Sequence, residues 1–567
     1  MSFQVEETQQ NKRVGGDKEM EWVRDSSLDH KGRLPLRSST GTWRASFFII
    51  AIEFTERLSY FAIATNLITY LTKVMHQDLT TAAKNVNNWA GVTTITPLLG
   101  AFIADAYTGR FLMILLSSSI YLMGLGILTM SEFIPSIKPS KGKVHELVFF
   151  TGIYLLSLGS GGIKPSLESF GADQFDDDNL KERKGKMSFF NWWNTALCSG
   201  LLLAVTVLVY LQDNVNWGFA NIVLTVTMAI TIIIFYFGRK FYRYRVPKGS
   251  PFTPILQVLV ASFTKRKLPH PSSSDSLYEL PDSGRLLNHT DKLRFLDKAC
   301  IVEDNEIQAP SPWRQSTVTK VEETKLIVNM IPIWLTSLQF GVCIAQPATF
   351  FVKQSSTMNR MIGKSFEIPP ATISALTAVG MLSCVVFYEK IMTPVLRRIT
   401  GKERGIPILQ RVGIGMIVSI LGMVIAALVE KQRLMVAEKE KGSNVRFLSM
   451  SVFWLAPQLL ILGIADGFTL VGLQEFYYEQ VPDSMRSLGI ALYLSVIGVG
   501  SFLSSFLITI VGEVTGIMGG SWFGKDLNSS RLDRFYWMLA AMNALNFGVY
   551  VFLAKRHIYK NVQRNVK

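Results

Sequence analysis

Long apolar segments alternate with short polar connectors along most of the chain. Each apolar segment is about 20 residues or longer, which is the length that an α-helix needs to cross the hydrocarbon core of a bilayer. We therefore expect an all-α, multi-pass membrane protein. The predicted membrane-spanning helices number twelve and lie at residues 44–72, 85–107, 111–131, 145–168, 187–211, 217–238, 324–351, 368–392, 407–430, 449–477, 487–512 and 534–554.

The polar segments divide the chain into five regions. A polar tail at 1–43 precedes the first span, and a second tail at 555–567 follows the last one. The connector at 239–323 is long, polar and rich in Pro and Ser, and it separates a six-helix half at 44–238 from another at 324–554. The first tail has no short apolar core of a signal peptide, so we expect the first spanning helix to act as the targeting signal.

Two six-helix halves joined by a long central loop are the layout of major-facilitator transporters. The connector after the second predicted span reads Gly100-Ala-Phe-Ile-Ala-Asp-Ala-Tyr-Thr-Gly-Arg110. It resembles the loop motif of that superfamily, in which an Asp/Arg pair holds helix ends together on the cytosolic side. We therefore expect a major-facilitator fold with an ion pair between Asp105 and Arg110; the alternative for this motif is an ordinary tight loop with a surface ion pair.

Composition agrees with a membrane protein. The chain is 49% hydrophobic and 18% charged, whereas soluble proteins carry about 25% charged residues. The net charge of +15 comes mainly from connectors, which indicates cytosolic loops rather than nucleic-acid binding. Lys and Arg favour the tails and the even-numbered connectors, so we expect both termini in the cytosol; the connector at 431–446 departs from this trend.

Three charges interrupt the first apolar segment. Glu53, Glu56 and Arg57 are spaced i, i+3, i+4, so a helix places them on one face. A charge near the bilayer centre costs about 2.5–3.5 kcal/mol, and three are tolerable only if they pair or face a protein-lined or watery interior. Two acids against one base leave one carboxylate unbalanced, which predicts a proton-binding group. A static ion-pair network that braces the bundle is the alternative.

A Gly-rich stretch runs from Gly159 to Lys164. It differs from a phosphate-binding loop, which requires Gly-Lys-Ser/Thr, because Pro165 follows Lys164. Small residues in a spanning helix instead permit close contact between helices. The four cysteines contain no CxxC pair, and no nucleophile triad or metal cluster is visible. We therefore expect no enzyme activity, no cofactor and no metal.

The central connector contains an amphipathic stretch. Apolar residues at near-helical spacing run from Pro254 to Phe263, and Lys265, Arg266 and Lys267 follow. The pattern predicts a helix that lies along the membrane surface with its basic end towards the headgroups. An amphipathic loop helix that packs on the bundle remains the alternative.

Five parts of the chain carry recognisable motifs, which are Glu53-x-x-Glu56-Arg57-x-x-Tyr60-Phe61, Gly159–Pro165 with Gly171–Asp176, Lys186–Asn194, Leu293–Ala299 and Thr319–Glu323. Together they resemble the proton-dependent oligopeptide transporter family, and within it the plant nitrate/peptide branch. In the first motif, Phe61 stands where the family frequently has a second Tyr.

The resemblance implies roles for particular residues. Glu53, Glu56 and Arg57 are expected to couple transport to protons. Lys164 is expected to form a gating charge pair with Asp466. Relatives frequently carry Glu at the position of Asp466. The alternative for Asp466 is an Asp at a kinked or capped helix segment. By family position, the expected substrate-binding residues are Tyr60, Asn191, Trp334 and Gln346.

Two departures from the family pattern leave the solute open. Ala64 stands where peptide carriers typically have an Arg that anchors the peptide carboxylate, and Ile344 stands where one relative has a nitrate-binding His. An anion could still meet Arg57 or Lys164. We expect a secondary active transporter that moves nitrate, a peptide or a small organic acid or hormone-like molecule by proton symport with alternating access.

Other functions and locations remain open at this level. The alternatives to symport are a proton-independent uniporter or exporter and a membrane solute sensor that does not transport. The expected location is the plasma membrane or the vacuolar membrane, and Asp282–Leu287 fits an acidic di-leucine sorting pattern compatible with the latter. The sequence predicts protons, a small molecule and the lipid bilayer as partners, and leaves the oligomeric state undetermined.

Overall fold

The structure is a computed structural model in which helices predominate. Antiparallel pairs join β1 (Ser27–Leu28) to β2 (Tyr244–Arg245) and β3 (Met361–Ile362) to β4 (Phe366–Glu367). The residues that it describes are 22–23, 25, 27–139, 142–176, 179–247, 249, 252–269, 277–278, 289–301, 311–363, 366–401, 406–441, 447–481, 486–524, 526–557 and 559. The proposed sorting pattern at 282–287 lies outside these residues.

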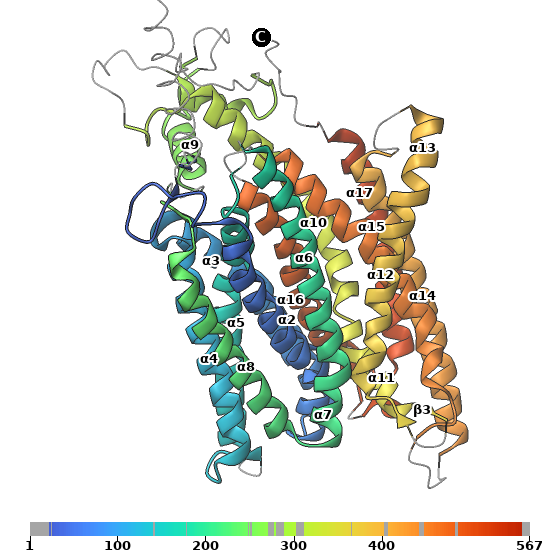
Figure 1. Ribbon diagram of the computed structural model, residues 1–567. Coiled ribbons are helices and arrows are strands. Elements are labelled where there is room, and N and C mark those ends of the chain that lie inside the picture. The colour runs from blue at the N-terminus through green and yellow to red at the C-terminus, as the bar shows by residue number, and fades with distance from the viewer. Residues whose placement is uncertain are drawn as a thin grey trace, which may run out of the picture. The chain divides into compact units, whose positions relative to one another are not determined.

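Sixteen α-helices account for most of the described residues, and short π-helical or 3-10 turns extend several of them (Figure 1). The α-helices are α2 (Thr42–Lys73), α3 (Leu79–Ile103), α4 (Arg110–Phe133), α5 (Lys143–Ala172), α6 (Leu180–Leu203), α7 (Val209–Asn214), α8 (Trp217–Phe237), α9 (Phe252–Thr264), α10 (Val318–Ile344), α11 (Val352–Thr357), α12 (Ala375–Phe387), α13 (Thr393–Thr400), α14 (Ile408–Lys439), α15 (Ala456–Gln480), α16 (Arg486–Ile517) and α17 (Leu532–Arg556). The 3-10 helix η6 (Arg294–Cys300) precedes α10.

Eleven helical segments of the described chain are long and apolar enough to cross a membrane. The helix α2 is outside this set because Glu53, Glu56 and Arg57 interrupt its apolar character, but its 32 residues would extend about 48 Å at 1.5 Å per residue. It occupies the place of the first predicted span. The predicted all-α membrane fold is confirmed. The eleven segments are Leu79–Thr108, Arg110–Phe133, Lys143–Ala172, Lys181–Asn214, Trp217–Lys240, Val318–Thr357, Pro370–Ile399, Ile408–Lys439, Val452–Gln480, Ala491–Ile517 and Leu532–Arg556.

The chain divides into two compact units. The first comprises Met1–Gly249 and Ala348–Ala375, and the second comprises Ser250–Pro347 and Leu376–Lys567. Most of the predicted central loop therefore groups with the second unit. The last residues of the predicted seventh span, 348–351, group with the first unit. Just after them, Lys353 Nζ donates to Thr72 Oγ1 of the same unit at 3.0 Å.

Close helix contacts build the first unit, in which α4 packs against α5 and α8, and α3 packs against α5. A Cβ atom added at Gly100 of α3 would lie 2.1 Å from the carbonyl oxygen of Gly161 in α5, and one added at Gly162 would lie 1.9 Å from Ser117 Oγ in α4. Such distances leave room only for hydrogen. The Gly-rich stretch therefore serves close contact between helices, in agreement with the prediction from the sequence.

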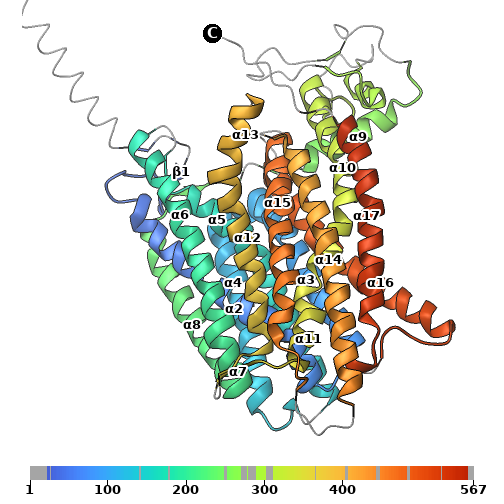
Figure 2. The same ribbon diagram turned by 90° about the vertical axis from the view of Figure 1, so that its right-hand side faces the viewer.

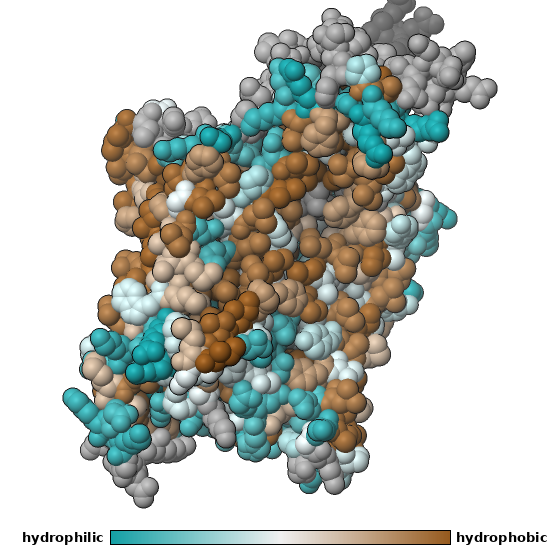
Figure 3. Space-filling model, turned by 180° about the vertical axis from the view of Figure 1, so that it is seen from behind, coloured by the Kyte–Doolittle hydropathy of each residue, from teal (hydrophilic) through white to brown (hydrophobic). Residues whose placement is uncertain are grey.

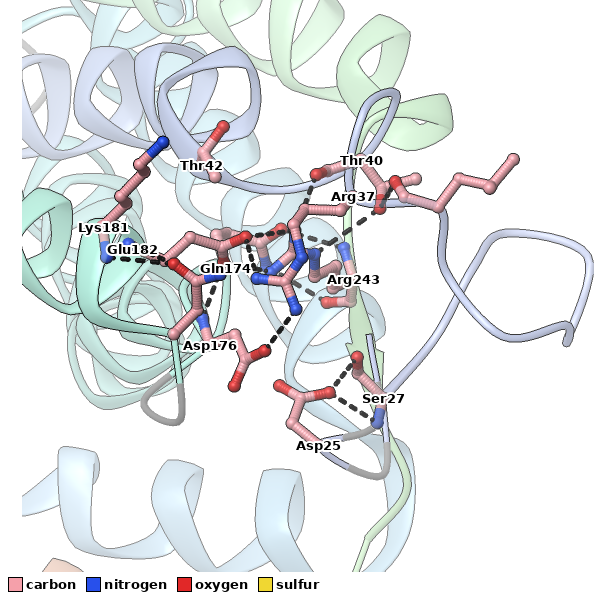
Figure 4. Close-up of polar contacts among 12 residues, drawn as sticks. Asp25, Ser27, Arg37, Thr40, Thr42, Gln174, Asp176, Lys181, Glu182 and Arg243 are labelled. Atoms are coloured by element: carbon pink, nitrogen blue, oxygen red, sulfur yellow. Dashed lines mark hydrogen bonds and ion pairs between the residues drawn. The ribbon is translucent and has the colours of Figure 1, made fainter. Parts of the chain in front are cut away.

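A buried polar network, here called the clasp, ties together three connecting regions of the first unit (Figure 4). Its members are Arg37, Thr40, Asp176, Glu182 and Arg243. Glu182, in the first turn of α6, accepts hydrogen bonds from Arg37 Nη1 at 2.8 Å and Arg243 Nη1 at 2.7 Å. Arg37 Nη2 also pairs with Asp176 at 2.7 Å, and Arg243 Nη2 donates to the Thr40 carbonyl oxygen at 2.9 Å. The segment before α2 is thereby held against the start of α6 and the segment after α8.

The predicted ion pair after the second apolar segment is present. Arg110 Nε lies 3.3 Å from Asp105 Oδ1. Arg110 also pairs with Asp173, which follows α5, and Arg245 Nε lies 3.2 Å from the other oxygen of that carboxylate. The motif therefore connects the start of α4 to the end of α5 and to β2.

The second unit is built around α14, which packs against α15 and α17, while α10 packs against α16 and α17 (Figure 2). Arg433 and Glu430 of α14 form a fully buried ion pair at 2.7 Å. Arg433 Nη1 also donates to Asn528 Oδ1 at 2.7 Å and so holds the loop before α17. On the outside of the helices, hydrophobic side chains cover much of the surface and hydrophilic ones gather towards the helix ends (Figure 3).

Candidate functional site

The three predicted charges of α2 lie together in the first unit. Glu53, Glu56, Arg57 and Tyr60 occupy positions i, i+3, i+4 and i+7, so they line one helix face. Arg57 Nε lies 2.6 Å from Glu53 Oε1 and 3.6 Å from Glu56 Oε2. Both carboxylates are fully buried. The pairing requires only local helix geometry, which is why the sequence alone could predict it.

A second polar stripe faces this one from α5. Ser160 and Lys164 are four residues apart, so they lie one above the other on the helix. Ser160 Oγ donates to Glu56 Oε1 at 2.7 Å, and Lys164 Nζ lies 3.8 Å from the same oxygen. Two helices from distant parts of the sequence thus share the Glu56 carboxylate.

Aromatic rings support the lysine. Lys164 Nζ lies 3.8 Å from the centroid of the Tyr60 ring, a cation–π distance. The Tyr60 ring stacks on Trp89 with centroids 5.7 Å apart, and Trp89 Nε1 donates to the Ile153 carbonyl oxygen at 2.9 Å. The face of Tyr60 is therefore held in place to receive a cation.

Glu168 adds a third carboxylate that the sequence analysis missed. It lies one turn after Lys164 on α5 and interacts electrostatically with Arg57. The signal was present in the sequence, because positions 160, 164 and 168 follow the i, i+4 spacing of one helix face. With Glu168, three carboxylates interact with Arg57, so the acidic groups of the cluster outnumber its two cations, Arg57 and Lys164.

The cluster has unsatisfied acceptors and accessible cations. Glu53 Oε2 and Glu56 Oε2 are buried without a hydrogen-bond partner in the part of the chain that the structure describes. The side chains of Arg57 and Lys164 retain 17% exposure, whereas those of Glu53 and Glu56 have none. A small molecule can therefore reach the two cations, which suit an anion or a carboxylate, and it can also reach the exposed Glu168.

The remaining predicted gating residue, Asp466, lies on α15 of the second unit. The Asp466 carboxylate interacts electrostatically with Cys343 and with Tyr493. Within its own unit, it makes no ion pair with any residue that the structure describes. Because Lys164 belongs to the other unit, the Lys164–Asp466 pair stays a prediction.

Three of the four predicted substrate-binding residues, Asn191, Trp334 and Gln346, lie outside the helices α2 and α5 that form the charge cluster. Trp334 Nε1 donates to Ser495 Oγ at 2.7 Å. Gln346 is fully buried, and its amide donates to the Val342 carbonyl oxygen at 2.9 Å. Asn191 belongs to α6, but its side chain lies outside the described part of the structure. Of the four predicted residues, only Tyr60 is brought into contact with the charge cluster by the described contacts.

A second charged cluster joins the central loop to α10. His289, Asp297 and Glu322 bring metal-ligating atoms within 4.8 Å of one another. Lys325 Nζ lies 2.7 Å from a carboxylate oxygen of both Asp297 and Glu322. Its ammonium group already supplies positive charge between the two acids, so the contacts support a role in holding the loop to the helix.

Comparison with known proteins identifies relatives over nearly the whole chain. Residues 111–523 match the family described as PTR2, the POT family. The Arabidopsis thaliana Protein NRT1/PTR FAMILY 5.6 is 59% identical over 562 residues, which cover 96% of each chain. Protein NRT1/PTR FAMILY 5.7 of the same plant is 56% identical over 564 residues, covering 96% of this chain and 93% of the relative.

Solved structures share the fold at lower identity. An auto-inhibited POT family peptide transporter aligns with a TM-score of 0.69 and 21% identity, covering 92% of this chain and 98% of the other. A POT family transporter in complex with 5-aminolevulinic acid aligns with a TM-score of 0.61 and 14% identity, covering 90% and 96%. At these identities the likeness concerns the fold.

Proposed function

The chain belongs to the POT family, and from this premise we propose that this membrane transporter moves a small anionic solute together with protons by alternating access. The observation that carries the proposal is the shared Glu56 carboxylate. It is fully buried and is contacted by Ser160 at 2.7 Å, Arg57 at 3.6 Å and Lys164 at 3.8 Å.

The cluster provides a physical link between solute and proton. An anionic group that binds Arg57 or Lys164 draws positive charge away from Glu53 and Glu56. A buried carboxylate that loses its compensating cation is costly, and it relieves that cost by taking a proton. Because linkage is reciprocal, protonation of the carboxylate frees a cation for the solute and strengthens solute binding.

We infer the solute class from the two cations of the site. Arg57 and Lys164 present two cations within one site, whereas Ala64 adds no third cation on the same helix. Nitrate, a peptide carboxylate and a small organic or hormone-like acid all supply the required negative charge. The transporter in complex with 5-aminolevulinic acid shows that this fold admits a small acid in another protein, which is compatible with the proposal.

The proposed orientation places both termini in the cytosol of a plant cell. Support comes from the Lys and Arg residues, which favour the tails and the even-numbered connectors. The plasma membrane and the vacuolar membrane are the two proposed locations.

The test is current measured in voltage-clamped oocytes at acidic external pH. Nitrate, dipeptides and hormone-like acids are each applied to cells that express the wild type, Glu56→Gln or Glu513→Gln, with surface expression measured for all three. Glu513 is the matched control because it carries the same functional group but lies exposed near the end of α16. We expect inward current with at least one solute in the wild type and in Glu513→Gln, and its loss in Glu56→Gln.

Other outcomes separate the alternatives. Solute uptake that is independent of external pH and unchanged in Glu56→Gln would contradict proton coupling and support a uniporter or exporter. Binding of labelled solute without uptake, in cells with normal surface expression, would support a sensor.

A further inference from the structure

The helix α9 (Phe252–Thr264) confirms that the central loop contains the predicted amphipathic helix. One face of α9 is fixed to its own unit. Val258 and Ala261 belong to a buried cluster with Val321 of α10. On the same face, Ser262 Oγ donates to the Leu296 carbonyl oxygen at 3.1 Å, and Lys265 Nζ donates to the Ile301 carbonyl oxygen at 2.6 Å. These contacts determine which way the rest of the helix points.

The opposite face of α9 is apolar and exposed. Leu256, Leu259, Val260 and Phe263 follow the spacing i, i+3, i+4, i+7, so they form one stripe along the helix. Their exposed fractions are 52%, 40%, 43% and 67%. Contiguous apolar patches of this kind mark interaction surfaces, so the stripe requires a covering that the described chain does not supply.

A groove with a basic end lies beside this stripe. Its volume is about 580 Å³, and its apolar wall includes Leu259, Phe263 and Phe295 of η6. Arg266 and Lys298 line the same groove. The Arg266 guanidinium lies 4.3 Å from the centroid of Phe263, and Lys298 Nζ donates to the Arg266 carbonyl oxygen at 2.7 Å. An apolar trough thus ends at two cations, which is the complement of a molecule with an apolar chain and an anionic head.

The helix α9 lies beside the N-terminal part of α10 (Figures 1 and 2). The buried face of α9 contacts α10 at Val321, and the uncharged run of α10 begins at Leu326. Five residues of α-helix span about 8 Å. The contact therefore lies near the N-terminal end of the segment Val318–Thr357 and before its uncharged run, so we expect it near the lipid headgroups, where amphipathic helices insert their apolar face by about 5–10 Å.

We propose that the groove between α9 and η6 binds an anionic phospholipid of the surrounding bilayer. Its acyl region covers the stripe of Leu256, Leu259, Val260 and Phe263, and its phosphate meets Arg266 and Lys298. Charge complementarity selects an anionic lipid over a neutral one. The site anchors the central loop to the membrane and is independent of the solute site on α2 and α5.

The first test measures lipid selectivity in the full-length protein. The purified transporter is exposed to an equimolar mixture of phosphatidylglycerol and phosphatidylcholine, and the bound lipids are counted by native mass spectrometry. Removing two cations near a membrane surface is expected to lower the preference for phosphatidylglycerol by about tenfold or more, so Arg266→Gln/Lys298→Gln should lose most of it. The control Arg239→Gln/Lys240→Gln removes two exposed cations elsewhere and should keep the wild-type ratio. An unchanged ratio in the groove variant, with an unchanged melting temperature, would overturn the proposal.

The second test asks what covers the stripe. A nitroxide label is attached at Val260→Cys or Lys267→Cys in a Cys198→Ser background, because Cys198 is the exposed cysteine and the other three are buried. In nanodiscs that contain phosphatidylglycerol, oxygen should relax the label at 260 more than a water-soluble nickel chelate does, and the order should reverse at 267. Preference for nickel at 260 would mean that the stripe faces water. Protection from both reagents would mean that protein covers it, and either result would overturn lipid binding.

Discussion

Replacement of Glu182 by Gln should destabilise the first unit through the clasp. The substitution keeps the size of the side chain but removes its charge and replaces one acceptor oxygen with a donor. Glu182 accepts hydrogen bonds from Arg37, from Arg243 and from the backbone nitrogen of Asp176 at 2.8 Å. The amide cannot satisfy all three donors, because it has only one acceptor atom.

The expected magnitude follows from the burial of the two arginines. Breaking a buried ion pair by removing one partner costs about 3–5 kcal/mol. Arg243 is fully buried but keeps its bond to the Thr40 carbonyl oxygen, and Arg37 has a side-chain exposure of 24% and keeps Asp176. Because these contacts remain, Glu182→Gln should lower the free energy of unfolding by about 3 kcal/mol, the lower end of that range. Arg37→Met removes the more exposed partner and should cost about 1 kcal/mol.

The free energy of unfolding is measured by titrating the full-length protein with sodium dodecyl sulfate in mixed micelles. The control is Lys181→Gln, which changes the adjacent exposed position and should stay within about 0.5 kcal/mol of the wild type. The reasoning would be refuted if Glu182→Gln unfolded as easily as this control, or if it cost no more than Arg37→Met.

Two further stability predictions use the same titration. Gly100→Ala places a Cβ 2.1 Å from the Gly161 carbonyl oxygen, so it should lower the free energy of unfolding by about 1–3 kcal/mol because it forces α3 away from α5. The control is Gly126→Ala, whose new Cβ has no atom within 4 Å and therefore causes no clash. An equal loss of stability in the two variants would contradict this explanation. Arg433→Met removes the ion-pair partner of the buried Glu430 and should lower the free energy of unfolding by about 3–5 kcal/mol. The double variant Glu430→Leu/Arg433→Met should recover much of this stability. A double variant as unstable as Arg433→Met would count against a charge-based explanation.

The predicted site was partly accessible from the sequence because some of its geometry is local. Positions 53, 56 and 57 fall on one face of any helix, so their pairing requires no knowledge of the fold. Glu168 follows the same rule relative to Lys164, so its place on the same face of α5 was also accessible from the helix spacing. The contact between Lys164 and Glu56 depends on the tertiary structure, since helix periodicity cannot say which face of α5 meets α2.

The clasp and the lipid groove were beyond the reach of sequence patterns. Arg37 and Glu182 are 145 residues apart, and neither lies in an apolar segment where a charge would be conspicuous. The sequence does not tell which face of α9 is buried, because Val258 and Ala261 on one face are as apolar as Leu259 and Val260 on the other. Only contact with η6 and α10 decided which face is buried.

The sequence by itself determined that this protein is a helical membrane transporter and where its long apolar helices lie. A segment of about 20 apolar residues must be a helix in a bilayer because its backbone has no other hydrogen-bond partners, and this requirement is local. The tertiary structure decided which charges neutralise one another, since that depends on contacts between helices far apart in the chain. It is these contacts that bury Glu56 beside two cations and leave the basic groove of α9 open.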